Sequence, residues 1–360
     1  MGRSRQSIGR RVPHARDARR TLDGARVYRR GCDRAVARRC AVGDAAAGDC
    51  SDDRRAARRN RAIVIDWLLL VLPGCVWGAS FLFIAEGLES VGPNGVTFLR
   101  ILIGFLTLSA MPAARRPIRR ADRWKTAGLG VLWLAFPLSM FPFAEQHVSS
   151  ALTGMLNGAT ALFAAAVASL LARRLPARGV LVGLAVGFTG AVLIAWPGVA
   201  APDPGDGQAF GVLLIVFALT SYGFAYNVAG PLQQRNGALP VIWRALGASV
   251  LLTAPLGIPA VLHAHWTLWP VLSLLTLGAF GTAIANVLAA MGAGRMGATT
   301  ASATTFLIPV VALVVGVAVR HEQVAALSIA GAAICLTGAW LIRRARAAET
   351  VVAVDQIASR

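Results

Sequence analysis

Ten apolar runs, most of them about twenty residues long, follow one another along the chain after Asp66. A helix rises ~1.5 Å per residue, so a run of this length spans the hydrocarbon layer of a bilayer. The runs do not alternate apolar and polar residues as the strands of a membrane barrel do. Since backbone polar groups in lipid need partners within the protein, each run must form a helix. The sequence therefore predicts an all-α membrane protein with ten transmembrane helices, at 66–86, 94–113, 126–145, 150–172, 179–198, 209–230, 239–262, 268–291, 299–319 and 324–342.

The composition excludes several other classes of protein. Hydrophobic residues make up 56% of the chain and charged residues 15%, whereas a soluble domain has about 25% charged residues. The five cysteines show no CxxC spacing, so neither a disulfide framework nor a metal site is indicated. The chain has no P-loop, HExxH or GxSxG sequence. We therefore expect no catalytic residues, no metal ligands and no cofactor.

Residues 1–62 form an extension that is rich in arginine and has no sustained apolar period. Such a segment buries too little apolar surface to offset the entropy of ordering, so we expect it to be disordered. An alternative is a polybasic arm for anionic lipid or nucleic acid. The segment lacks interleaved aromatic residues and a recognisable fold, so we expect no nucleic-acid partner.

The loops between the runs differ in charge on the two sides of the membrane. On one side, four loops carry eleven basic residues, whereas Arg320 is the single basic residue in the loops of the other side. Positive residues concentrate in cytoplasmic loops. The bias predicts a multi-pass protein of the bacterial inner membrane with both termini in the cytoplasm.

The chain repeats itself at an offset of about 145 residues. The sequence TGAVLI at 189–194 returns as TGAWLI at 337–342, and Arg100 corresponds to Arg244. Trp77 and Gly78 correspond in the same way to Tyr222 and Gly223. These matches define two units of five helices each, at 63–198 and 209–346, followed by a cytoplasmic tail at 347–360.

An odd number of helices in each unit makes the second unit enter the membrane from the opposite side. The sequence therefore predicts an inverted repeat, which is the architecture of many secondary transporters. Two halves that exchange shapes expose a central site first to one side of the membrane and then to the other.

Several motifs in these units resemble one known family. They are WGASF at 77–81, followed by FLR at 98–100; RMGATTA at 295–301, running into FLIPV at 306–310; and Glu322 before the last helix. Together they resemble the EamA family of the drug/metabolite transporter superfamily. The first repeat departs from the family, with arginines at 173–174 where the corresponding glutamate would fall. The resemblance implies ten helices and a permease that exports or imports amino acids, other metabolites or drugs.

Arg100 and Arg244 are the charged residues that stand out inside the apolar runs. A cation in a spanning helix is costly unless it faces a cavity, a partner or the lipid headgroups. One interpretation is that the two arginines face the transport cavity and hold a substrate carboxylate or gate its two mouths. The other is that they extend to the headgroups or bond to helix-end carbonyls.

Aromatic and amide side chains give the remaining candidates for the substrate pathway. They lie at helical spacing on the first helix of each repeat or near the middle of the membrane. Amides in lipid need partners, either across helices or in a wet cavity, so packing between helices is the alternative role. These candidates are Trp77, Ser80, Phe81, Asn157, Tyr222, Tyr226, Asn227 and Asn286.

Glu86 and Glu145 lie at outer helix ends and are candidates for proton coupling. A partly buried carboxylate can titrate near neutral pH, although solvated helix ends are the alternative. The sequence as a whole predicts a secondary transporter of small metabolites, with amino acids, related compounds or drugs as its expected substrates. We expect alternating access driven by proton antiport, by analogy. The alternatives are a membrane-embedded enzyme and a membrane scaffold without transport activity.

Overall fold

The computed structural model describes residues 47–199, 207–296 and 302–358. The chain divides into two units, residues 1–64 and 65–360. Of the first unit, residues 47–64 are described and are helical. In the described ranges every regular element is a helix, as expected of an all-α protein.

The helices of the first repeat are α2 (Ala47–Leu88), α3 (Pro93–Ser109), η1 (Arg120–Asp122), α4 (Arg123–Gly130), η2 (Val131–Ala135), α5 (Phe136–Ala144), α6 (Ser150–Asn157), α7 (Thr160–Ala172) and α8 (Arg178–Val199). Those of the second are α9 (Gln208–Asn236), α10 (Ala238–Leu262), α11 (Leu268–Thr276), η3 (Leu277–Ile284), α12 (Ala285–Met296), η4 (Ser302–Phe306), α14 (Leu307–Arg320) and α15 (Ala326–Ala358).

The described residues contain 8 helical stretches that are long and apolar enough to cross a membrane. Two further apolar stretches, Pro93–Ser109 and Thr304–Arg320, are shorter. Together they coincide with the ten apolar runs of the sequence. Because two of them fall short of the usual spanning length, the count of ten transmembrane helices stays a prediction.

The structure differs from the sequence-based expectation at the first helix. Helix α2 begins at Ala47, well before the apolar run that starts at Asp66, and a disordered extension at 1–62 stays a prediction. Alanine and arginine dominate this stretch, and both are strong helix formers even where no apolar face exists. Residues 1–46 of the expected extension lie outside the described residues.

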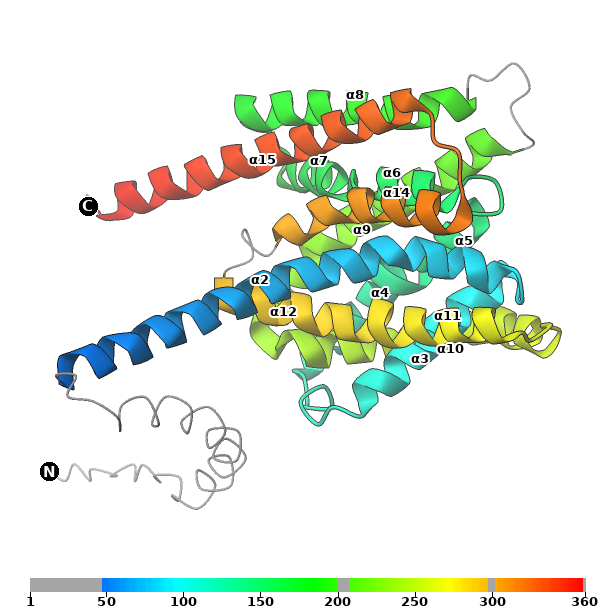
Figure 1. Ribbon diagram of the computed structural model, residues 1–360, viewed down its shortest axis with the longest axis horizontal. Coiled ribbons are helices and arrows are strands. Elements are labelled where there is room, and N and C mark those ends of the chain that lie inside the picture. Colours follow the sequence, from blue (N-terminus) through cyan, green and yellow to red (C-terminus); the bar gives the residue numbers. More distant parts are fainter. Residues whose placement is uncertain (1–46, 200–206, 297–301, 359–360) are drawn as a thin grey trace, which may run out of the picture. The chain divides into compact units, whose positions relative to one another are not determined.

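Corresponding helices of the two repeats pack against each other in opposite directions. The last helices, α8 and α15, lie side by side in Figure 1, and their glycines bring the backbones into contact. Gly183 lies against Gly338, whereas Gly190, further along α8, lies against Gly331, earlier in α15. The residue numbers of the contacts rise along α8 and fall along α15, so the two helices run antiparallel.

Two other pairs show the same relation. Phe98 and Phe105 of α3 lie next to Gly257 and Gly247 of α10, again with opposite numbering. In the pair of α6 and α14, Gly154 lies against Ala312, whereas Gly158, just past the end of α6, lies against Pro309, earlier in α14. Helices that are equivalent by sequence therefore point in opposite directions, which is the arrangement that an inverted repeat requires.

The third helix of each repeat contains a π-helical stretch, η2 in the first and η3 in the second. The two stretches begin at Val131 and Leu277, at nearly the same offset as the sequence repeat. A π-helical turn widens the helix and often occurs at a functional site. Nothing in the local sequence indicated these stretches.

Candidate functional site

A cavity of about 90 Å³ lies between the two repeats. A single water needs about 10–15 Å³ on this measure, so the cavity has room for several waters or a small solute. Both π-helical stretches contribute to its wall. The lining residues are Trp77, Ser80, Phe81, Ile84, Arg100, Trp133, Leu134, Leu138, Phe141, Asn157, Thr160, Tyr222, Tyr226, Gly281, Thr282, Asn286, Thr305 and Ile308.

The structure brings together most of the residues that the sequence singled out for the substrate pathway. Those that line the cavity are Trp77, Ser80, Phe81, Arg100, Asn157, Tyr222, Tyr226 and Asn286. Asn227 is not among them: its amide donates to the carbonyls of Ala164 and Gly223 at 3.1 and 2.8 Å. In this structure Asn227 thus joins α9 to α7.

Arg244 does not line the cavity either, although it is equivalent to Arg100 by sequence. Its guanidinium donates to the carbonyl of Pro240 at 3.1 Å and lies 5.2 Å from the ring centre of Trp243. These contacts agree with the alternative given above, in which the arginine bonds to a carbonyl of its own helix end.

The guanidinium of Arg100 is the charged group in the cavity wall. The residue is 5% exposed, and its Nε lies 3.4 Å from the hydroxyl oxygen of Thr282. Among the described residues, no carboxylate lies within ion-pair distance of it. A buried cation without a carboxylate in ion-pair contact is costly, so the cavity wall offers an unpaired positive group to a solute.

Aromatic rings form a continuous wall on another side of the cavity. Phe81 contacts Phe141 edge to face, with ring centres 5.5 Å apart. Phe141 continues to Tyr222 at 6.0 Å, and Tyr222 to Tyr226 at 5.9 Å. Trp133 closes the row against Tyr226 at 6.0 Å. Such a wall contacts apolar groups, and its ring faces also attract cations.

Trp133 and Phe141 were missed by the sequence analysis. Both come from the third helix of the first repeat, where the π-helical stretch η2 changes which side chains face inward. The aromatic cluster FPLSMFPF at 136–143 was the signal available in the sequence, but its inward face depends on the bulge.

The first helix of each repeat donates a hydrogen bond to the π-helical stretch of the other repeat. The indole Nε1 of Trp77 donates to the carbonyl of Gly281 at 3.1 Å. The hydroxyl of Ser221 donates to the carbonyl of Leu132 at 2.7 Å. A π-helical turn changes the pairing of backbone carbonyls, and these side chains supply donors from across the interface.

The fourth helix of the first repeat is broken where it meets the cavity. Helix α6 ends at Asn157, and α7 begins at Thr160, whose hydroxyl donates to the carbonyl of Asn157 at 2.6 Å. Pro309 of α14 packs at Gly158, where a Cβ atom would meet its ring at 2.6 Å. Broken helices of this kind present polar groups to solutes within a membrane.

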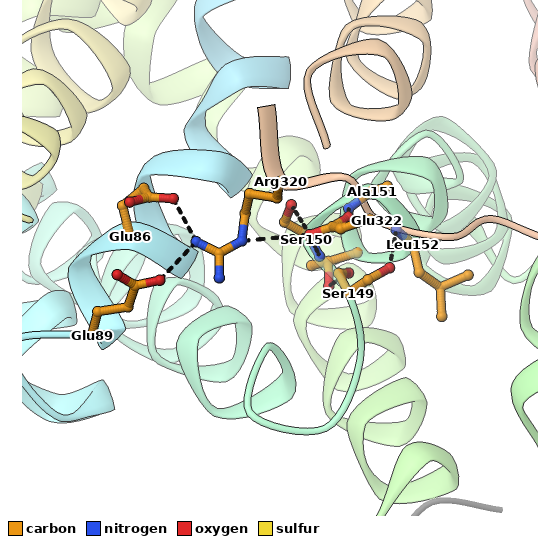
Figure 2. A network of polar contacts seen from close by, with 9 residues as sticks. Glu86, Glu89, Ser149, Ser150, Ala151, Leu152, Arg320 and Glu322 are labelled. Atoms are coloured by element: carbon orange, nitrogen blue, oxygen red, sulfur yellow. Dashed lines mark hydrogen bonds and ion pairs between the residues drawn. The ribbon is translucent and has the colours of Figure 1, made fainter. Parts of the chain in front are cut away.

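A network of polar contacts joins α2, α6 and α14 at their ends (Figure 2). Arg320 pairs with Glu86 and, at 3.1 Å, with Glu89. Glu322 lies 3.9 Å from Arg320 and accepts three hydrogen bonds at the start of α6. The donors are the backbone nitrogen of Ser150 at 3.1 Å, its hydroxyl at 2.7 Å and the backbone nitrogen of Ala151 at 2.8 Å.

The two candidates for proton coupling therefore lie in different surroundings. Glu86 is paired with Arg320. Both carboxylate oxygens of Glu145 are buried and have no hydrogen-bond partner among the described residues.

Two antiparallel repeats of apolar helices around a small polar and aromatic cavity define a membrane transporter. A family model matches residues 65–196 and 209–344. The chain belongs to the EamA-like transporter family. The family and the relatives below are transporters, which argues against the alternative of a membrane enzyme.

Three relatives have been found over most of the chain. The chain is 28% identical over 280 residues to a "probable terminal-alkyne amino-acid exporter" of Streptantibioticus cattleyicolor, covering 76% of this chain and 92% of the relative. It is 20% identical over 280 residues to an uncharacterized transporter of Archaeoglobus fulgidus, covering 78% and 99%. It is 25% identical over 274 residues to the uncharacterized transporter YoaV of Bacillus subtilis, covering 74% and 92%.

The fold also matches a solved crystal structure at 17% sequence identity. The TM-score is 0.52, and the match covers 78% of this chain and 96% of that chain. At this identity the likeness concerns the fold alone.

Proposed function

We propose that the protein is a secondary transporter of small metabolites that carry a carboxylate, amino acids above all. The observation that carries the proposal is Arg100, a buried cation in the cavity wall without a carboxylate partner among the described residues. A guanidinium matches the geometry of a carboxylate and binds it with two parallel hydrogen bonds. The printed name of the Streptantibioticus relative, an amino-acid exporter, points to the same substrate class.

The rest of the cavity suits the other groups of an amino acid. The lining residues include no aspartate or glutamate, so the ammonium group would contact ring faces and the amide oxygens of Asn157 and Asn286. Ring faces attract cations. The aromatic row from Phe81 to Trp133 offers an apolar surface to the side chain of the substrate.

Transport would proceed by alternating access in the cell membrane, with both termini in the cytoplasm. The antiparallel pairing of equivalent helices supports this mechanism, because two halves of similar fold can exchange shapes. A reporter fused after residue 346 tests the orientation: a cytoplasmic reporter should be active there, and activity of a periplasmic reporter would contradict it.

Binding and uptake in proteoliposomes test the substrate class. Labelled leucine, phenylalanine and propargylglycine, a terminal-alkyne amino acid, are compared with their carboxamides, which lack the negative charge. We expect the acids to bind more tightly than the carboxamides. Arg100→Gln should weaken binding of the acids at least about thirtyfold, because truncating one partner of a buried charge pair costs about 2–5 kcal/mol.

Arg244→Gln is the matched control, since it removes the same charge from the equivalent position outside the cavity. It should leave binding unchanged. Equal binding of acids and amides, or equal loss in the two variants, would contradict the proposal.

A further inference from the structure

Two polar side chains of the cavity wall, Arg100 and Asn286, are both hydrogen-bonded to Thr282. We propose that Asn286 accepts a hydrogen bond from the ammonium group of the substrate, and that this contact selects amino acids over the same acids without an amino group. This inference rests on the proposed function, since it requires a carboxylate on Arg100.

The hydroxyl of Thr282 fixes one side of the guanidinium of Arg100. It donates its proton to the carbonyl of Leu277 at 3.2 Å, within the π-helical stretch η3. A threonine hydroxyl has one proton and two lone pairs, so its oxygen faces the Nε of Arg100, at 3.4 Å, as an acceptor. Among the described residues, none accepts a hydrogen bond from the two terminal nitrogens of the guanidinium. A carboxylate can therefore bind this pair of nitrogens with two parallel hydrogen bonds.

The backbone carbonyl of Thr282 fixes the amide of Asn286. The Nδ2 of Asn286 donates to this carbonyl at 2.8 Å, one turn earlier in the chain. A carbonyl only accepts hydrogen bonds, so the nitrogen of the amide, and not its oxygen, must face it. No described residue donates to the Oδ1 of Asn286. Because Asn286 lines the cavity, its amide offers an acceptor to a solute there.

Asn157, the other amide of the cavity wall, is not tied to Arg100 in this way. The Oδ1 of Asn157 accepts from the hydroxyl of Thr160 at 3.2 Å, and the same hydroxyl donates to the backbone carbonyl of Asn157 at 2.6 Å. Asn286, by contrast, shares Thr282 with the guanidinium. Of the two amides, Asn286 is therefore the one that the structure holds beside the carboxylate site.

This arrangement matches the charged end of an amino acid. The carboxylate and the ammonium of an α-amino acid are bonded to the same carbon atom, and the donor and the acceptor of the wall are held by the same residue, Thr282. A neutral amide also suits a position beside Arg100. An aspartate there would pair with the guanidinium and compete with the substrate carboxylate, whereas an amide oxygen accepts from the ammonium without competing.

Binding of matched ligands to the full chain in nanodiscs tests this contact. Leucine and phenylalanine are each compared with the acid that lacks only the amino group, which is isocaproate for leucine and hydrocinnamate for phenylalanine. The wild type should bind each amino acid at least about tenfold more tightly than its partner, because hydrogen bonds that involve a charged group are among the stronger ones.

Asn286→Leu removes the acceptor and nearly keeps the volume of the side chain. It should bring the affinity for leucine to within about threefold of that for isocaproate, and change isocaproate binding by less than about threefold. Asn227→Leu is the matched control, because Asn227 also donates to the carbonyl four residues earlier but does not line the cavity. It should keep the wild-type ratio. Asn286→Asp places a carboxylate beside Arg100 and should weaken isocaproate binding at least about tenfold.

The outcomes separate this inference from the proposed function. Equal binding of leucine and isocaproate by the wild type, a wild-type ratio that persists in Asn286→Leu, or an equal loss of the ratio in Asn227→Leu would overturn the role of Asn286 while leaving the carboxylate site intact. Absence of binding of both ligands by the wild type would overturn the carboxylate site and this inference with it. If Asn286→Leu fails to insert, unchanged isocaproate binding in Asn286→Asp would overturn the inference.

Discussion

Replacing Glu322 with alanine should destabilise the fourth helix of the first repeat. Its side chain is 11% exposed and accepts hydrogen bonds from two backbone nitrogens and one hydroxyl at the start of α6. Each buried donor left without a partner costs about 1–3 kcal/mol, and the negative charge adds about 0.3–1 kcal/mol at a helix N-terminus. With the hydroxyl free to turn to another acceptor, the two backbone donors and the charge together give an expected loss of about 2–7 kcal/mol for Glu322→Ala.

Thermal or denaturant unfolding in detergent measures this loss. Glu322→Gln keeps one oxygen acceptor and should lose about half as much. Glu89→Gln is the matched control, because Glu89 is 56% exposed and contacts the same arginine; exposed ion pairs contribute at most about 1 kcal/mol. A Glu322→Ala variant within about 0.5 kcal/mol of the wild type, or no more affected than Glu89→Gln, would refute the reasoning.

Two further predictions concern the packing of the repeats and the cavity. Gly338→Ala would place a Cβ atom 2.3 Å from the backbone nitrogen of Gly187, so unfolding measurements should show a loss of about 1–3 kcal/mol or more, whereas Gly230→Ala, with nothing within 4 Å, should show none. Trp77→Phe leaves the carbonyl of Gly281 without its donor; a cost of about 1–2 kcal/mol should lower the transport rate about 5- to 30-fold. Trp243→Phe, which loses a 2.7 Å bond to Ser109 outside the cavity, should leave transport unchanged.

Much of the fold could be predicted because lipid permits few structures. Each apolar run had to be a helix, and the odd number of helices expected in each unit required the two units to run in opposite directions. The glycine contacts between α8 and α15 show that opposition directly. Helix ends were harder to predict: α2 begins at Ala47, well before the apolar run that starts at Asp66.

The cavity could be anticipated only in part. Trp77 and Tyr222 stood out because equivalent positions of the two repeats both carry aromatic rings. Trp133 could not be identified, because its orientation depends on a π-helical stretch for which the local sequence has no signal. The contact of Glu322 with Ser150 joins residues 172 positions apart, and such pairing is set by the packing of whole helices.

Arg100 and Arg244 show how a symmetric scaffold acquires an asymmetric site. They occupy equivalent positions, yet only Arg100 lines the cavity, while Arg244 stacks on its neighbour Trp243. Leu99, which precedes Arg100, is the counterpart of Trp243. Its side chain has no ring face on which the guanidinium of Arg100 could stack outside the cavity. If alternating access exchanges the shapes of the repeats, no second arginine in the cavity wall takes over the position of Arg100, because Arg244 lies outside the cavity. On the proposed function, the same guanidinium then holds the carboxylate in both states, and we expect the helices that open and close to move around α3.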